Sequence, residues 1–226
     1  MIDIADRLTA TYREVRTSDS TDAACALVIR RRFRCAVDTV WQAVTEPDRI
    51  RAWFAPFTGG ARVGESFEVE GHATGTVLEC VPPHLFTVTW GDGANVTVRL
   101  APDEHANAVL ELVHAGLPTD GAVRQGPMWD VAIASLDRFV TEDTADDLAA
   151  WRASAEVQTF AQHSVSAWVT ATEASGAATA EDLADAVRAC LQRMAPDLMP
   201  PAPRERVSRT PRTPSLSLAR LCPCRG

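Results

Sequence analysis

A change of hydrophobic period in the middle of the chain constrains the fold more than any other feature. Between Gly64 and Ala115, apolar and polar residues alternate in five short runs, which is typical of strands with one buried face. The runs are SFEVE, TGTVLECV, LFTVTW, NVTVRL and AVLELVH, and the turn signals between them are Gly71, Pro82-Pro83, Gly91-Asp92-Gly93 and Pro102–Asn107. Such short connections predict an antiparallel meander. The residues expected on its inner face are Phe67, Val69, Phe86, Val88, Trp90, Val96, Val98, Leu100, Leu110 and Leu112.

The segment after the strands has the period of a helix and supplies a cover for that face. In GPMWDVAIASLDRFV, Gly126–Val140, an apolar stripe recurs at helical spacing. The stripe consists of Met128, Trp129, Ala132, Leu136 and Phe139, and the opposite face carries Asp130, Asp137 and Arg138. We expect one long helix on the concave face of a six-stranded sheet, with Asp130 solvated on the outer side.

The residues before the meander predict one more strand and two short helices. AACALVIRRRFRC has strand character, and its three consecutive arginines, residues 30–32, suggest that this strand lies near a sheet edge. The stretch VDTVWQAVTEPDRIRAWFAP then predicts two helices separated at Glu46-Pro47. In it we interpret Asp38 as an N-cap, Trp41 as a core residue, and Ile50, Trp53 and Phe54 as an inward-facing set. Trp53, Phe54 and Phe57 are expected where the second helix runs into a loop.

The two ends of the chain predict helices and a tail. Residues 2–15 read as an amphipathic helix with Ile4, Leu8, Tyr12 and Val15 on one side. Beyond residue 143 we expect helices over Asp146–Glu173 and Ala180–Ala195, with Gly176 between them and Thr179 with Asp182 as a capping pair. Residues 200–226 are rich in Pro, Arg and Ser, lack periodicity, and are predicted to be disordered.

The charge and cysteine content argue against several classes of protein. The formal net charge of −8 argues against nucleic acid as a partner, although all 22 basic residues are arginine. No apolar run approaches the roughly 20 residues that span a bilayer. The first residues lack the features of a secretion signal, so a cytoplasmic location with reduced thiols is expected for the six cysteines. The pair Cys222 and Cys224 alone is too little to predict a metal site, and we expect no metal or cofactor.

The order of elements and the local sequence resemble a known superfamily. Four segments, RRFRCAVDTVWQAVTEPDRIRAWFAP, GESFEVEG, GTVLECVPPHLFTVTW and VLELVHAGL, are similar to SRPBCC (START-like, helix-grip) proteins, and the resemblance covers roughly residues 24–140. Within that superfamily they resemble the branch of heat-shock-protein-90 ATPase activator homologues. The resemblance implies an α+β helix-grip fold, in which a curved antiparallel sheet wraps around a long C-terminal helix, followed here by extra C-terminal helices. The implied organisation is an N-terminal helix and loop (1–22), the START-like domain (23–143), a helical extension (144–199) and the tail (200–226).

The resemblance also implies a cavity between the sheet and the long helix, and this cavity is our candidate site. The residues expected to line it are Trp53, Phe54, Phe67, Trp90, Leu112, His114, Met128 and Trp129. Each has an alternative interpretation as plain core, and His114 as a histidine bonded at a strand end. Asp92 is interpreted as a turn residue. No phosphate loop, nucleophile elbow or metal-ligand cluster is present in the sequence, and no catalytic residue is assigned.

Three functions are open at this point. The first is binding of a small hydrophobic or aromatic ligand in the cavity, without a reaction and without nucleic-acid or membrane partners. The second is a co-chaperone or regulatory protein that meets a chaperone through the C-terminal helices, with Trp151, Phe160 and Trp168 as anchors. The third is an enzyme of the cyclase, dehydratase or hydrolase type that uses His114 as an acid or base.

Overall fold

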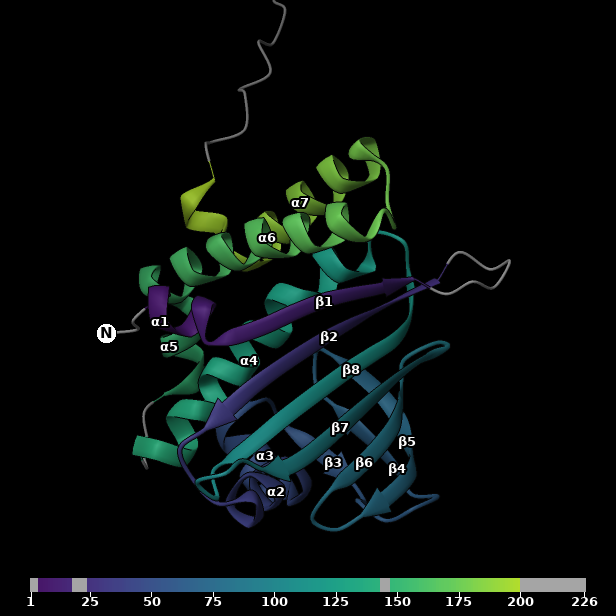
Figure 1. Cartoon of the computed structure of the whole chain (residues 1–226), viewed down its shortest axis with the longest axis vertical. Helices are drawn as coiled ribbons and strands as arrows, with labels where there is room; N and C mark the ends of the chain where they lie inside the picture. Colours follow the sequence, from purple (N-terminus) through teal and green to yellow (C-terminus); the bar gives the residue numbers. More distant parts are fainter. Residues whose placement is uncertain (1–3, 18–23, 143–146, 200–226) are drawn as a thin grey trace, which may run out of the picture.

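The strands form one antiparallel sheet that curves over a long helix (Figure 1). The computed structural model describes residues 4–17, 24–142 and 147–199. Its strands, in chain order, are β1 (Thr11–Thr17), β2 (Ala24–Phe33), β3 (Phe57–Gly59), β4 (Ser66–Val69), β5 (Ala73–Val81), β6 (Leu85–Trp90), β7 (Ala94–Pro102) and β8 (Ala108–Pro118). Their order across the sheet is β1-β2-β8-β7-β6-β5-β4-β3, and every neighbouring pair is antiparallel.

The helices lie on both sides of the long helix α4. They are α1 (Ile4–Thr9), α2 (Val37–Thr45), α3 (Pro47–Trp53), α4 (Gly121–Glu142), α5 (Leu148–Ala153), α6 (Ala155–Ser175) and α7 (Ala180–Met194), followed by the short 3-10 turn η1 (Pro196–Leu198). α4 packs against β2 and β8 of the sheet, and α6 and α7 pack against α4. Figure 1 shows α6 and α7 along one side of the molecule, next to β1. The predicted helix-grip fold with extra C-terminal helices is confirmed.

The hydrophobic alternation of the meander determines which side of the sheet faces α4. All five predicted runs form strands, β4 to β8, and the alternate residues Phe67, Val69, Val96 and Val98 are buried. Pro47 begins α3 as expected, and Gly176 ends α6 in the left-handed conformation. Thr179 and Asp182 form the predicted capping box of α7. Local signals of period and capping were therefore sufficient for these elements.

The prediction of one helix over residues 2–15 is wrong. Only α1 is helical, and Thr11–Thr17 forms β1, which pairs with β2 along its whole length. The sequence TYREVRT alternates, with Thr11 and Val15 buried and Tyr12 exposed, so its period is that of a strand. Because β1 covers β2, the three arginines do not mark an edge strand. The middle one, Arg31, is buried and pairs with Asp137 at 3.3 Å.

Several helix boundaries also differ from the prediction. α4 begins at Gly121 and carries Pro127 inside it, so the Gly-Pro pair read as a helix start lies one turn and a half into the helix. The expected helix over Asp146–Glu173 is two helices, α5 and α6. They are separated at Ser154, whose backbone is extended and whose hydroxyl oxygen accepts a hydrogen bond from the Val157 N–H as the N-cap of α6. Asp38 is not the N-cap of α2. It lies in the first turn, where the negative charge of a carboxylate interacts favourably with the helix dipole and stabilises the helix.

The burial of two tryptophans, Trp41 and Trp168, differs from what the sequence suggested. Trp41 is only partly buried, and its neighbours Val40 and Ala43 are the buried residues of α2. Trp168, expected as an exposed partner anchor, is fully buried, and so is Phe160. These two residues therefore do not form a partner surface, because they cover α4. One hydrophobic core runs from the sheet to Cys190 of α7. The predicted division of the chain into domains at residues 22 and 143 stays a prediction.

The prediction that Asp130 is solvated on the outer face of α4 is wrong. Its side chain is buried, and Oδ2 accepts hydrogen bonds from Arg13 Nε at 2.8 Å, Trp168 Nε1 at 2.9 Å and the Ser164 hydroxyl. Arg13 comes from β1, whereas Ser164 and Trp168 come from α6. Trp168 lies so close to Gly126 that a Cβ at that glycine would be 2.3 Å from the indole ring. Asp130 thus joins both ends of the chain to α4.

None of the helices that the structure describes is long and apolar enough to cross a membrane. Among the described residues no group of His, Cys, Asp or Glu is arranged to hold a metal ion. Cys222 and Cys224 and the predicted disordered tail lie outside the described residues.

We predict that Asp130→Ala lowers the free energy of unfolding by about 3–5 kcal/mol, because it leaves the guanidinium of Arg13 buried and unpaired. The measurement is urea denaturation followed by circular dichroism. Asp185→Ala is the control, since its ion pair with Arg188 is exposed on α7 and is worth less than about 1 kcal/mol. Equal destabilisation by the two substitutions would contradict a structural role for the Asp130 cluster.

Candidate ligand-binding cavity

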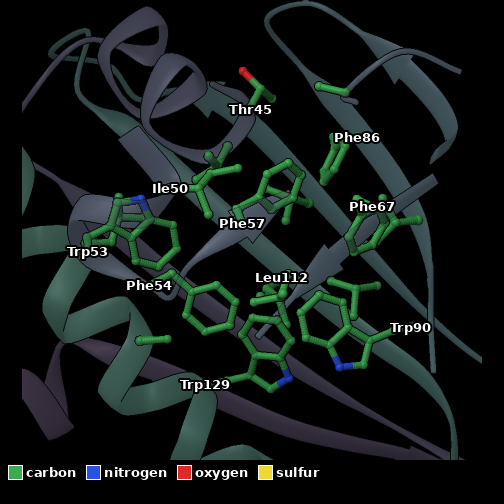
Figure 2. Close-up of a pocket in the computed structure, with 18 of the residues that line it drawn as sticks. Thr45, Ile50, Trp53, Phe54, Phe57, Phe67, Phe86, Trp90, Leu112 and Trp129 are labelled. Carbon is green, nitrogen blue, oxygen red and sulfur yellow. The ribbon is translucent and has the colours of Figure 1, made fainter. Parts of the chain in front are cut away.

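The candidate site is a cavity of about 80 Å³ between α3, the inner face of the sheet and α4 (Figure 2). α3 contributes Ile50 and Trp53, with Phe54 directly after it; Trp90 ends β6; and Trp129 comes from the buried face of α4. The remaining lining is almost entirely aliphatic or aromatic, with Val96 and Val98 of β7 and Leu110 and Leu112 of β8 among its members. The alternation of the strands and the helical stripe of α4 therefore meet at one apolar space.

An aromatic stack fills much of this space. The ring centroid of Phe54 lies 5.3 Å from Trp53, 5.7 Å from Trp129 and 6.3 Å from Trp90. Trp90 and Trp129 are 5.2 Å apart, and Phe67 lies 6.3 Å from Trp90. These separations are in the range in which aromatic rings attract one another. Figure 2 shows the rings as an arc from Trp53 through Phe54 and Trp129 to Trp90 and Phe67.

The free space is small as a result. About 80 Å³ is several times the volume that a water molecule requires, but it is less than the ~150 Å³ in which a benzene ring binds in an engineered apolar cavity. A ligand with an aromatic ring therefore needs a ring of the protein to move. Phe54 has no polar atom to anchor it, follows the last residue of α3 and also borders an adjoining hollow, so we expect its side chain to be the one that moves.

Most polar atoms around the cavity already have partners within the protein. The Trp53 indole donates to the carbonyl oxygen of Ala43 at 2.8 Å, and the hydroxyl of Thr45 donates to that of Trp41 at 2.7 Å. The Trp129 indole donates to His114 Nδ1 at 3.1 Å. The indole N–H of Trp90 makes no hydrogen bond with any described residue, and Trp90 is half-buried. Of the three indoles in the lining, that of Trp90 alone thus has its N–H without a partner among the described residues.

The structure brings six of the eight predicted site residues together around the cavity. These are Trp53, Phe54, Phe67, Trp90, Leu112 and Trp129. Met128 does not line it; the residue precedes Trp129 on α4, is rotated by about 100° from it, and faces a second hollow. His114 does not line it either, because Trp129 lies between. The binding role of all eight stays a prediction.

His114 is buried in an environment that keeps it neutral. It is 2% exposed, and burial lowers its pKa from 6.5 to about 4. Since Nδ1 accepts a hydrogen bond from Trp129, the proton of the neutral ring is on Nε2, and that atom has no partner among the described residues. A histidine with this pKa is a weak base at neutral pH, so the geometry gives little support to the enzyme hypothesis.

The sequence reasoning missed two residues beside Phe54. The guanidinium carbon of Arg152 lies 5.9 Å from the centroid of the Phe54 ring, and the His72 ring stacks on it at 4.8 Å. Arg152 comes from α5 and His72 from the turn before β5, so no local pattern connects them with α3. Three further wall residues were not assigned to the site: Ile50 and Val98, which were predicted to face inward, and Phe57, which was expected where the second helix runs into a loop.

Comparison with known proteins identifies the family. The family model described as "Activator of Hsp90 ATPase homolog 1-like protein" matches residues 34–141. The crystal structure of CalU16 from Micromonospora echinospora is 30% identical in sequence, with a TM-score of 0.60, and the match covers 73% of this chain and 99% of CalU16. The chain belongs to the AHSA1-like family of the SRPBCC superfamily. The resemblance stated from the sequence is confirmed.

Two further structures agree with this assignment. The solution structure of CalU16 is 31% identical, has a TM-score of 0.60, and is covered over 97% of its length and 74% of this chain. A conserved protein of unknown function from Enterococcus faecalis, EF2215, is 15% identical with a TM-score of 0.55, over 95% of its length and 74% of this chain, and shares the fold alone. A search of curated proteins found no match. AHSA1-like membership supports a fold of the ligand-binding or co-chaperone type.

We predict that His114 makes the stability of this AHSA1-like protein depend on pH. Between pH 6.5 and about pH 4 the unfolded chain binds a proton that the folded protein does not, so falling pH favours unfolding. The loss attributable to His114 is about 3 kcal/mol, and all of this stability is present above pH 6.5.

The measurement is urea denaturation between pH 7 and pH 4. His114→Gln keeps an acceptor for the Trp129 indole but does not titrate, so its stability should fall less steeply than that of the parent protein. The exposed His105→Gln is the control and should follow the parent. Parallel curves for the parent and His114→Gln would contradict the assignment.

Proposed function

We propose that this AHSA1-like protein is cytoplasmic and binds a small hydrophobic or aromatic molecule between its curved sheet and α4. The observation that carries the proposal is an apolar space walled by a stack of aromatic rings, with the Trp90 N–H as a free donor at its side. A core that served stability alone would gain by filling this space, because voids cost packing energy. The four described cysteines are free, which supports a reducing compartment.

The energy for binding comes mainly from apolar contact. Burial of apolar surface contributes ~25 cal/mol per Å², so a ligand of one or two rings reaches micromolar affinity without an ionic contact. Part of this energy is lost to the displacement of Phe54. We therefore expect a flat ligand to bind best. Its ring would replace the stacking contacts with Trp90 and Trp129 that are lost when Phe54 moves.

The two alternatives have less support from this geometry. Co-chaperone activity remains in keeping with the AHSA1-like family, but two of the three anchors predicted for it, Phe160 and Trp168, are buried. The third, Trp151, is half-buried and lies under the guanidinium of Arg138, 5.6 Å from its ring centroid. For an enzyme, His114 is neutral, hydrogen-bonded to Trp129 and off the cavity wall. Ligand binding requires none of these residues to rearrange.

We predict that ring compounds perturb the tryptophans of the cavity selectively. In ¹H–¹⁵N spectra the protein has six indole N–H signals, one for each tryptophan. Titration with 2-naphthol should shift the signals of Trp90 and Trp129, whereas that of Trp168, held by Asp130, should stay in place. A folded protein in which neither cavity signal moves with any of a set of one- and two-ring compounds would contradict the proposed function.

We further predict that Trp90→Phe removes the preference for a polar tip on the ligand. The parent should bind 2-naphthol more tightly than naphthalene by ~1 kcal/mol, the net value of one hydrogen bond. In Trp90→Phe the two affinities should become equal, with a small change of melting temperature because apolar bulk is retained. The control is Trp41→Phe, outside the cavity, which should keep the preference. Isothermal titration calorimetry measures all six affinities.

A further inference from the structure

A second hollow, of about 170 Å³, adjoins the cavity at Phe54. Phe54 lines both spaces, so its ring separates the apolar cavity from this hollow. The second hollow has an apolar part, formed by Met128 and Val131 of α4 and Met194 of α7. It also has a polar part that the first cavity lacks, formed by Arg152, Arg193 and His72.

The polar part is positively charged and has no carboxylate in its lining. Within the described chain, neither Arg152 nor Arg193 forms an ion pair. Arg193 donates to the carbonyl oxygen of Arg124, and Arg152 donates through Nη2 to that of Trp53 at 3.4 Å. A charged side chain that is partly removed from water is costly unless an opposite charge or strong hydrogen bonds compensate it. One carbonyl oxygen at 3.4 Å is little compensation for the partly buried guanidinium of Arg152, whereas Arg193 is exposed to solvent.

The Nε atom of Arg152 also lacks a hydrogen-bond acceptor. It is buried and has no hydrogen-bond partner among the described residues. Burial lowers the pKa of Arg152, and burial together with the charges of Arg152 and Arg193 lowers the pKa of His72. The carboxylate nearest in sequence is Glu156, four residues after Arg152; it does not line the hollow and forms no ion pair within the described chain. Glu156 Oε1 is itself buried without a partner, but it lies outside the lining, so the lining holds donors and positive charge and no carboxylate.

We propose that the two spaces are halves of one binding site for a small amphipathic carboxylate, with its ring in the apolar cavity and its carboxylate on Arg152 and Arg193. This inference rests on the proposed function and adds the charge and the chemical class of the ligand. A guanidinium group binds a carboxylate through two parallel hydrogen bonds, which would use the free Nε of Arg152. The aromatic body would take the place of Phe54 beside Trp53 and Trp129.

The apolar part of the lining selects the kind of anion. A phosphate monoester carries up to two charges and is strongly hydrated, whereas Met128, Val131 and Met194 offer it no hydrogen bond. A monocarboxylate with an apolar body matches both parts of the hollow. His72 adds no charge at neutral pH, because burial lowers its pKa, and the face of its ring that now stacks on Phe54 would be available to the ligand.

The test compares 1-naphthaleneacetate with 1-naphthaleneacetamide, which have the same shape and differ in charge. By isothermal titration calorimetry the parent protein should bind the carboxylate at least tenfold more tightly. Arg152→Gln and Arg193→Gln should each weaken carboxylate binding about tenfold and leave binding of the amide unchanged. Arg152→Lys should keep more of the carboxylate affinity than Arg152→Gln. The control is Arg188→Gln, an exposed residue on the same helix as Arg193, which should bind both compounds like the parent.

Each outcome distinguishes this inference from the proposed function. If the parent binds amide and carboxylate equally, the charged half of the site is refuted while apolar binding stands. If neither compound binds, the proposed function fails for ligands of this size and the inference fails with it. If the arginines matter but the indole signals of Trp90 and Trp129 do not move with the carboxylate, the two spaces are not one site. Should Arg152→Gln fail to fold, the exposed Arg193→Gln decides the question.

Discussion

The burial of α4 on both of its faces is the constraint on which the rest of the structure depends. One face carries Trp129, Ala132 and Leu136 into the concave side of the sheet, and the other carries Asp130 into a cluster with Arg13, Ser164 and Trp168. A buried carboxylate is tolerated because three donors meet one of its oxygens. These donors come from β1 and α6, so one element before the meander and one after α4 together hold α4 in place against the sheet. The position of Trp129 in the cavity follows from that placement.

The position of α4 also determines how far the cavity is filled. Ser135 of α4 donates its hydroxyl to the carbonyl oxygen of Trp53 at 2.7 Å, and the Trp53 indole is bonded to Ala43, so α2, α3 and α4 are joined at Trp53. Trp129 is likewise fixed through His114. Phe54 lies between these fixed rings without a polar contact of its own. Trp53 and Trp129 are therefore held by hydrogen bonds, whereas Phe54 is held by ring contacts alone.

The sequence predicted what local period and capping control, and it failed where distant segments decide. The strands β4 to β8, the capping box at Thr179 and six of the residues around the cavity follow from alternation and from the helical stripe. Asp130 was misread because a polar residue on an amphipathic helix is solvated unless another element covers it, and the cover here comes from both chain ends. Thr11–Thr17 was misread because a short alternating run beside a helical turn has two interpretations. Arg152 and His72 escaped notice because only the fold brings them to Phe54.

The stack around Phe54 bears on which ligands the site prefers. Each aromatic contact is worth about 0.5–1.5 kcal/mol beyond the area it buries, and Phe54 has such contacts with Trp53, Trp90, Trp129 and His72. Moving the ring out therefore costs roughly 2–6 kcal/mol before any ligand contact forms. A saturated chain of the same volume recovers the buried area but not these contacts. A flat ring in the place of Phe54, beside Trp53 and Trp129, would recover both, and a carboxylate on that ring would add an ion pair with Arg152, which Phe54 meets only through the face of its ring. If the cavity binds a ligand as proposed, the same arrangement that nearly closes it would thus favour aromatic over aliphatic ligands.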